Sequence, residues 1–268
     1  MPEIPELEAL VVKLNEVLSG KKIISAKVLN HIILHGNTAS EFEQTVEGTV
    51  LQSFRADGKF LVISLDLPFE IVLHPMLAGR FRYLFEKRNA GKTDCIVFRL
   101  SEGTLWYNDR KQMSRVYLVD KGVYTDVAGF IGRGVSALDA SLTAEIFQKR
   151  ITNFHGPIKN VLRNQRFLKG IGNAYADEIL LFAGILPFRK RSSLNIEELE
   201  KLHSAITSVL TRYKALLLKR SLNEVISEPR DFLMIHGKSD GICPLCGGRI
   251  SEITADRFRT NYCQTCQK

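Results

Sequence analysis

The chain has 268 residues, and its 37 Lys and Arg outnumber 29 Asp and Glu, which gives a formal net charge of +8. With 45% hydrophobic and 25% charged residues it has an ordinary globular composition, which excludes disordered and fibrous chains and allows two hydrophobic cores. No apolar run approaches the ~18 residues of a membrane span, and the N-terminus is acidic where a signal peptide would be basic. We therefore expect a soluble, cytosolic protein with no membrane partner.

Helical periodicity opens the chain. Between residues 3 and 19 apolar side chains recur at the spacing of one helical face, and Gly20 follows where a C-terminal glycine is expected. From Lys22 to about Asp120 the pattern changes to eight short β-rich runs, with hairpin-like turns at residues 57–58 and 102–103. Strands at this spacing predict a two-sheet sandwich or a flattened barrel.

The second half of the chain is predicted to be helical. After a Gly-rich crossover at residues 129–134 come helices over 142–150, 157–168 and 174–182, then a longer helix that starts with a capping box at Asn195 and Glu198. The fold class is therefore α+β. We expect an N-terminal sandwich domain over residues 1–128, a helical domain over 129–229 and a cysteine-rich segment over 230–268.

Two C-x-x-C pairs lie close to the C-terminus, at Cys243, Cys246, Cys263 and Cys266. In a chain without an export signal this spacing favours one structural zinc ion, bound by four thiolates that leave no position for water or substrate. The intervening segment can fold back as a β-hairpin. Arginines at 249, 257 and 259 make that hairpin suited to phosphate contacts.

Three separated segments resemble a single family. Residues 2–6 (Pro-Glu-Ile-Pro-Glu) resemble the opening P-E-L-P-E of the formamidopyrimidine-DNA glycosylase and endonuclease VIII group of base-excision repair enzymes. Residues 170–178 (Gly-Ile-Gly-Asn-Ala-Tyr-Ala-Asp-Glu) resemble its helix-two-turn-helix signature, and the four cysteines resemble its terminal zinc finger. The resemblance implies a bifunctional glycosylase and lyase that acts as a monomer on damaged double-stranded DNA, in the cytosol or nucleoid of a bacterium.

The chemistry that the resemblance implies begins at Pro2. Removal of Met1 leaves a secondary amine, and because α-amino groups titrate at about 8, this amine is a nucleophile near neutral pH. It would attack C1′ of the damaged nucleotide, expel the base and form an iminium, while Glu3 protonates the sugar oxygen and shuttles protons. Glu6 would organise the site, and Lys59 would neutralise a phosphate. Taken alone, Pro2 and Glu3 fit ordinary helix-start chemistry and Lys59 fits a solvated turn.

The helical half holds further candidate DNA contacts. Asn173 follows a Gly-x-Gly turn at the start of a helix, where exposed backbone N–H groups bind phosphate and an amide side chain adds a donor. His155 and Lys159 belong to a basic cluster with Arg163 and Arg166. This cluster fits either a DNA-binding face or a solvated face, and we favour DNA.

The sequence departs from the family pattern where wedge side chains fill the gap left by a flipped base. The family has H-x-G-M-S-G and D-P-R-R-F segments, whereas the corresponding segments here begin at His74 and Asp109 and read HPMLAG and DRKQM. Leu77, Lys111 and Met113 therefore fall at the wedge positions. They keep an apolar, basic, apolar character but lose the aromatic ring, so the preference for a partner base is not inherited.

A second departure lies on the zinc hairpin. The arginine with which the family grips phosphates falls on Phe258, between Arg257 and Arg259. Neighbouring strand residues point to opposite faces, so neither arginine simply takes its position, and the second elimination is in doubt. The segment 221–242 also lacks the Gly-rich loop of the 8-oxoguanine enzymes, so specificity for 8-oxoguanine does not carry over.

Two alternatives remain at this point. The altered wedge and Phe258 allow a non-catalytic reader of damaged or abasic DNA on the same scaffold, although Pro2 beside Glu3 argues for catalysis. The basic composition alone would also fit a zinc-ribbon protein of RNA or the ribosome.

Overall fold

The computed structural model describes residues 1–86, 88–227, 230–255 and 258–268, which form two compact units. The first unit contains Met1–Gly132 and Leu216–Pro229, and the second contains Arg133–Ala215 and Arg230–Lys268. No helix among the described residues is both long and apolar enough to cross a membrane.

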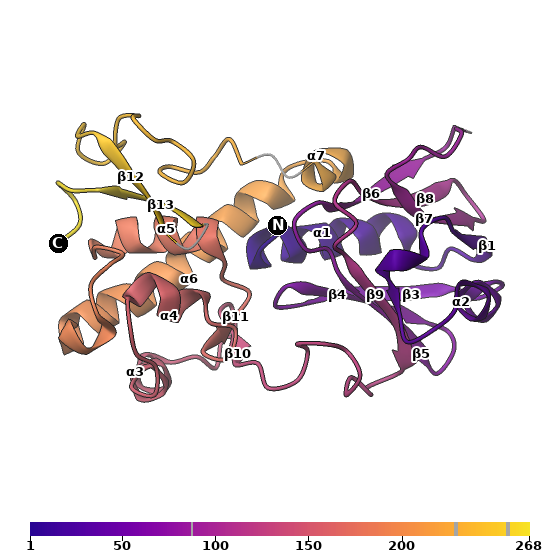
Figure 1. Ribbon diagram of the computed structural model, residues 1–268, viewed down its shortest axis with the longest axis horizontal. Coiled ribbons are helices and arrows are strands. Elements are labelled where there is room, and N and C mark those ends of the chain that lie inside the picture. Colours follow the sequence, from indigo (N-terminus) through magenta and orange to yellow (C-terminus); the bar gives the residue numbers. More distant parts are fainter. Residues whose placement is uncertain (87, 228–229, 256–257) are drawn as a thin grey trace. The chain divides into compact units, whose positions relative to one another are not determined.

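Two facing sheets form the first unit (Figure 1), as the β-rich runs predict. One sheet is antiparallel, in the order β1 (Ile23–Val28), β7 (Asp94–Leu100), β8 (Thr104–Asp109) and β6 (Gly79–Leu84). The other has the order β2 (Leu34–His35), β9 (Arg115–Asp120), β5 (Phe69–His74), β4 (Phe60–Leu65) and β3 (Leu51–Asp57), and in it β2 is parallel to β9. The expected sandwich is confirmed.

Helix α1 (Ile4–Leu18) is packed firmly into this unit, because Leu14 and Leu18 are fully buried in the core that both sheets share. The helix packs against β3 and β4. Strand β4 is buried on both faces, which explains its unbroken apolar sequence: Ile63 faces the shared core, and Phe60 faces a smaller cluster that includes Phe130 from the Gly-rich crossover.

Two short helices of this unit were not predicted from the sequence. Both α2 (Ala39–Val46) and α7 (Leu222–Ile226) are too short for a clear apolar stripe, and capping boxes at Thr38 and Ser221 start them. Helix α7 packs against α1 and β6. For this reason the residues directly after the long helix, up to residue 229, belong to the first unit, whereas those from Arg230 onward belong to the second.

The second unit contains the helices α3 (Ala144–Ile151), α4 (Ile158–Arg163), α5 (Asn173–Ala183) and most of α6 (Ile196–Leu218), with 3-10 turns at Arg191–Ser193 here and His31–Ile33 in the first unit. Short parallel strands β10 (Val135–Ser136) and β11 (Leu168–Lys169) pair, and β12 (Ile250–Ala255) and β13 (Phe258–Cys263) form the C-terminal hairpin. Helix α4 is shorter than the predicted 157–168 because Asn164 turns to extended backbone.

The hairpin is not a separate body within this unit. Ile235, Ile250 and Cys263 are buried against Leu181 of α5 in one apolar cluster. The Gln267 amide joins the same structure, since its oxygen accepts from the Cys263 N–H at 2.7 Å and its nitrogen donates to the Ile185 carbonyl at 2.8 Å. The division into three domains stays a prediction.

Candidate active site, DNA interface and metal centre

The N-terminus is buried at the start of α1. Glu3 and Glu6 are each only 2% exposed, and the Glu6 Oε2 accepts the Glu3 backbone N–H at 2.9 Å. Glu6 therefore satisfies a donor that the first helical turn cannot satisfy itself, and fixes the direction in which the chain enters the helix. This contact supports the prediction that Glu6 organises the site around Pro2 and Glu3.

A small cavity of about 20 Å³ adjoins the terminus, which is room for about one water molecule. Pro2, Glu6 and Arg80 contribute to its wall, and most of the remaining lining is apolar. The sequence analysis missed Arg80, which follows Gly79 on β6. Nothing in its pattern distinguishes it from a solvated strand residue.

Lys59 lies in the tight turn between β3 and β4, where Gly58 adopts a φ of 63° that favours glycine. Its side chain is partly buried. Two residues further along β4, Leu61 lines the same cavity as Pro2. The fold thus brings the Lys59 turn and the N-terminus to neighbouring parts of the first unit.

The predicted wedge residues lie on two loops that one polar network joins. The Ser114 hydroxyl donates to the Asp109 carboxylate at 2.7 Å and lies 3.2 Å from the Pro75 carbonyl, and the Tyr107 hydroxyl donates to the Ser114 oxygen at 2.7 Å. A Cβ at Gly79 would lie 1.9 Å from the Tyr107 hydroxyl oxygen, so only glycine fits there. The loop of residues 75–78, before β6, and the loop of residues 110–114, after β8, are therefore held together.

Both loops present apolar side chains to solvent: Leu77 is 44% exposed and Met113 is 42% exposed. The residues directly before them, Met76 and Gln112, have φ values of 48° and 52°, a conformation that non-glycine residues adopt rarely. Lys111, on the same loop as Met113, is also exposed. The structure thus brings these three predicted wedge residues to accessible positions.

The His74 side chain makes contacts within the first unit. Its Nδ1 accepts the Met76 N–H at 3.1 Å, and its ring packs edge-on against Phe60 with centroids 4.6 Å apart. The imidazole therefore shapes the loop that carries Leu77. A DNA contact by His74 stays a prediction.

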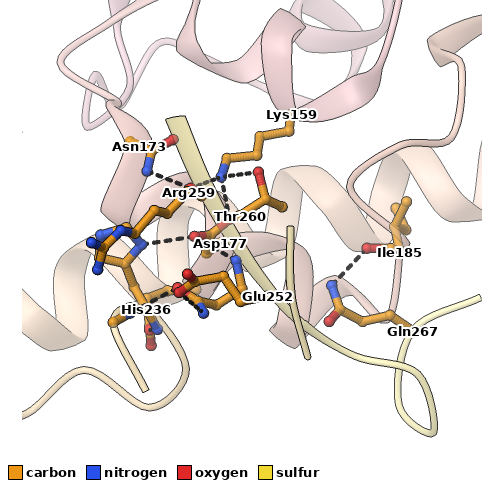
Figure 2. Close-up of polar contacts among 12 residues, drawn as sticks. Lys159, Asn173, Asp177, Ile185, His236, Glu252, Arg259, Thr260 and Gln267 are labelled. Atoms are coloured by element: carbon orange, nitrogen blue, oxygen red, sulfur yellow. Dashed lines mark hydrogen bonds and ion pairs between the residues drawn. The ribbon is translucent and has the colours of Figure 1, made fainter. Parts of the chain in front are cut away.

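In the second unit, the start of β13 is bound to two helices (Figure 2). Asn173 Nδ2 and Lys159 Nζ both donate to the Arg259 carbonyl, at 2.8 and 3.0 Å. The Lys159 ammonium also donates to Thr260 Oγ1 at 2.8 Å and pairs with Asp177 at 2.6 Å. These contacts fix the hairpin on α4 and α5.

Lys159 lies inside the second unit. It is 4% exposed and is a buried ion-pair partner, not part of an open basic face. Burying this charge is tolerable because Asp177 is fully buried beside it, the Arg259 carbonyl and Thr260 Oγ1 accept from Lys159, and His236 Nδ1 lies 2.7 Å from Asp177 Oδ2. A contact of Lys159 with DNA stays a prediction, and the ion pair opposes it.

The other predicted contacts of this unit are accessible. His155 and Arg259 are both exposed. Asn173 is the first residue of α5 and uses one of its two amide hydrogens on the Arg259 carbonyl, so the amide retains a second donor. Arg257 lies outside the described residues.

The four C-terminal cysteines fit a zinc ion. Their sulfur atoms all lie within 4.8 Å of one another, with 3.8 Å between Cys243 and Cys266 and 3.5 Å between Cys246 and Cys263. A tetrahedron with Zn–S bonds of ~2.3 Å has edges of ~3.8 Å, whereas a disulfide needs ~2.05 Å. Four thiolates close the site, so its role is structural.

The comparisons agree with this geometry. The family model of the formamidopyrimidine-DNA glycosylase N-terminal domain matches residues 1–116, and that of the formamidopyrimidine-DNA glycosylase H2TH domain matches residues 134–222. A formamidopyrimidine-DNA glycosylase of Pelotomaculum thermopropionicum is 30% identical over 274 residues, which cover 100% of this chain and 99% of the relative. One from Bacillus cereus is 29% identical with the same coverage.

Solved structures show the same fold. Wild-type Lactococcus lactis formamidopyrimidine-DNA glycosylase, in complex with DNA that contains an oxidized pyrimidine, has a TM-score of 0.89 at 23% identity, with 100% of both chains covered. The same protein with DNA that contains an abasic site has a TM-score of 0.87 at 22% identity, with 99% of both covered. The fold and the sites thus define a zinc-finger protein of the helix-two-turn-helix class. The chain belongs to the formamidopyrimidine-DNA glycosylase family.

We expect Asp109→Asn to loosen both wedge loops. The carboxylate accepts the Lys111, Met113 and Ser114 N–H groups at 2.9, 2.8 and 2.7 Å. Burial alone would raise the pKa of Asp109, but the bonds from Ser114, Lys111 and Met113 hold it below its usual value. The substitution should lower the free energy of unfolding at pH 7 by roughly 2 kcal/mol, measured in urea.

The pH dependence follows from that lowered pKa. The advantage of wild type over Asp109→Asn should be constant above the unfolded pKa of ~3.9 and should disappear as the pH falls through the lower folded value. Asp139→Asn is the control, because the exposed Asp139 accepts similar bonds from Ser141. Equal losses in both variants would contradict the role given to Asp109.

Zinc removal should unfold the hairpin and abolish DNA binding, and Cys263→Ser should have the same effect. Cys95→Ala is the matched control: this thiol is buried in the first unit, and burial raises its pKa to about 11. Bound zinc and DNA affinity are measured together. A zinc-free protein with wild-type DNA affinity would refute the structural role of the metal.

Proposed function

We propose that this protein is a DNA glycosylase of base-excision repair with abasic-site lyase activity, acting on double-stranded DNA that carries a damaged base. The observation that carries the proposal is that Pro2 is buried directly before α1 with Glu3 beside it. Family membership supports the same conclusion. Because its substrate is DNA, the enzyme would act in the cytosol or nucleoid.

The proposed reaction uses the Pro2 nitrogen after Met1 has been removed. The amine's lone pair forms a bond to C1′ as the bond to the damaged base breaks and the electron pair leaves with the base; the proton that the amine nitrogen then loses balances the proton that the departing base takes up. Glu3 protonates the sugar oxygen, so the ring opens and an iminium forms between Pro2 and C1′.

Strand cleavage then follows from the iminium. It acidifies the 2′ proton, and removal of that proton expels the 3′ phosphate by elimination, with Lys59 as the cation that neutralises the departing charge. Hydrolysis of the remaining iminium regenerates the amine. Lys59 is suited to this role by its place in the β3–β4 turn, two residues from Leu61 and the cavity beside Pro2.

Several exposed groups support DNA binding. We propose that Asn173 and Arg259 bind the backbone of the DNA, where the N-terminus of α5 adds its own N–H groups. Leu77, Lys111 and Met113 would fill the space that the flipped nucleotide leaves. A non-catalytic reader of damage is not favoured, because binding alone requires neither a terminal amine nor a buried carboxylate beside it.

Borohydride reduction tests the proposed mechanism, because it converts the iminium into a stable covalent link. We expect the protein to be trapped on a duplex with an abasic site, and on those damaged duplexes that it processes. A form that retains Met1 should give no adduct, because its Pro2 nitrogen is an amide. Pro2→Gly should give much less.

Pro5→Ala is the matched control, since this buried proline lies in the first turn of α1, three residues after Pro2, but has no free amine. It should be trapped like the wild type. Tight binding without any adduct at the abasic site would refute catalysis and favour a reader of damage.

The wedge assignment predicts that Leu77→Ala slows base excision on duplex DNA by roughly tenfold or more, since a few kcal/mol of unstacking energy is no longer offset. On single strands the rate should change little, because no partner strand has to be held open. Rates of excision are compared on both substrates. Equal losses on duplex and single strand would contradict a wedge function.

A further inference from the structure

The guanidinium of Arg163 lies directly over the ring of Phe258. Its Cζ is 3.7 Å from the ring centroid, well inside the distance at which a cation is attracted to an aromatic face. Arg163 is the last residue of α4 and Phe258 is the first residue of β13. The contact therefore joins the helical part of the second unit to the end of the zinc hairpin.

This pair lies at the surface of the second unit and is not a core contact. Phe258 is 45% exposed and Arg163 is partly buried. A stacked guanidinium keeps its N–H groups in its own plane, so the ring and a hydrogen-bond acceptor use different parts of the group. Phosphate is the acceptor that this planar fork matches best.

The position of the pair is fixed by its surroundings. Directly after Phe258, the Arg259 carbonyl accepts from both Lys159 and Asn173, and Thr260 also accepts from Lys159. Figure 2 shows these bonds tying the strand to α4 and α5. Because the backbone beneath the ring is held, Phe258 can act as a rigid support for the arginine.

The pair also lines an open groove. Its other described lining residues are Lys159 and polar or apolar side chains such as Asn160, Asn164 and Phe188, with no acidic group among the described residues. Asparagine amides can donate to phosphate or sugar oxygens, and Phe188 is 42% exposed. This chemistry fits the backbone of a nucleic-acid strand.

We propose that Arg163, supported by the Phe258 ring, binds a backbone phosphate of the DNA. The inference rests on the proposed function, because it takes DNA as the partner, and it adds a phosphodiester-binding residue on α4. The ring has a supporting role: it holds the guanidinium over the hairpin and does not itself bind phosphate.

The test is the salt dependence of binding to a duplex that contains tetrahydrofuran, a stable abasic-site analogue that cannot form an iminium. Arg163→Ala should lower the slope of log Kd against log salt by about 0.9, as expected for one lost phosphate contact. At moderate salt the Kd should rise roughly tenfold, the effect of one charge-assisted bond. Phe258→Leu should show a smaller loss of affinity with the slope nearly kept.

Arg212→Ala is the matched control. This exposed arginine of α6 also lies over a phenylalanine, with its Cζ 5.8 Å from the Phe182 ring centroid, and it removes the same charge from the same unit. Its slope and Kd should match those of the wild type. An equal effect in this control would show a general charge effect and overturn the proposal.

A double variant keeps the test decisive if Arg163→Ala folds poorly. Arg163→Leu combined with Phe258→Arg moves the guanidinium across the contact and should recover most of the lost slope. Arg163 would be purely structural if its removal lowered the melting temperature but left the slope and Kd unchanged. Borohydride trapping of the wild type on an ordinary abasic site reports separately on the proposed function.

Discussion

Pro2, the proposed nucleophile, is buried directly before α1, and the packing of this helix fixes the backbone that follows it. Here α1 supplies that support, because Leu14 and Leu18 are buried in the core shared by both sheets. Glu6 then fixes the entry into the helix through the Glu3 N–H. The placement of Pro2 thus follows from core packing, and the Lys59 turn and the loops that carry the predicted wedge residues are built on the same two sheets.

In the second unit, a small hairpin with little core of its own is held in place by contacts at both of its ends. Four thiolates surround the zinc site at one end, and a buried charge network holds the other end. Asp177 pairs with Lys159 and His236, and Lys159 reaches across to the Arg259 carbonyl. Removing one member would leave a buried charge without compensation, so the network favours a single arrangement of β13 on α4 and α5.

Much of this could be predicted from the sequence, because periodicity and spacing are local. The first helix, the strands and the cysteine ligands follow from such patterns. The burial of Lys159 could not be predicted, because its partner Asp177 is on another helix and a helical lysine is usually solvated. The Asp109 network joins two separate loops, and α7 is too short for periodicity to show. The stacking of Arg163 on Phe258 gives a physical reason for the ring where the family motif has an arginine.

The central claim is that the chain's own terminal nitrogen attacks the sugar. Peptide mapping by mass spectrometry of the borohydride-reduced adduct tests this claim most directly, because it locates the bond on one residue. We predict that the sugar fragment is attached to Pro2 in the N-terminal peptide that has lost Met1. Attachment to Lys59 or to another lysine, with an unmodified N-terminal peptide, would contradict the account.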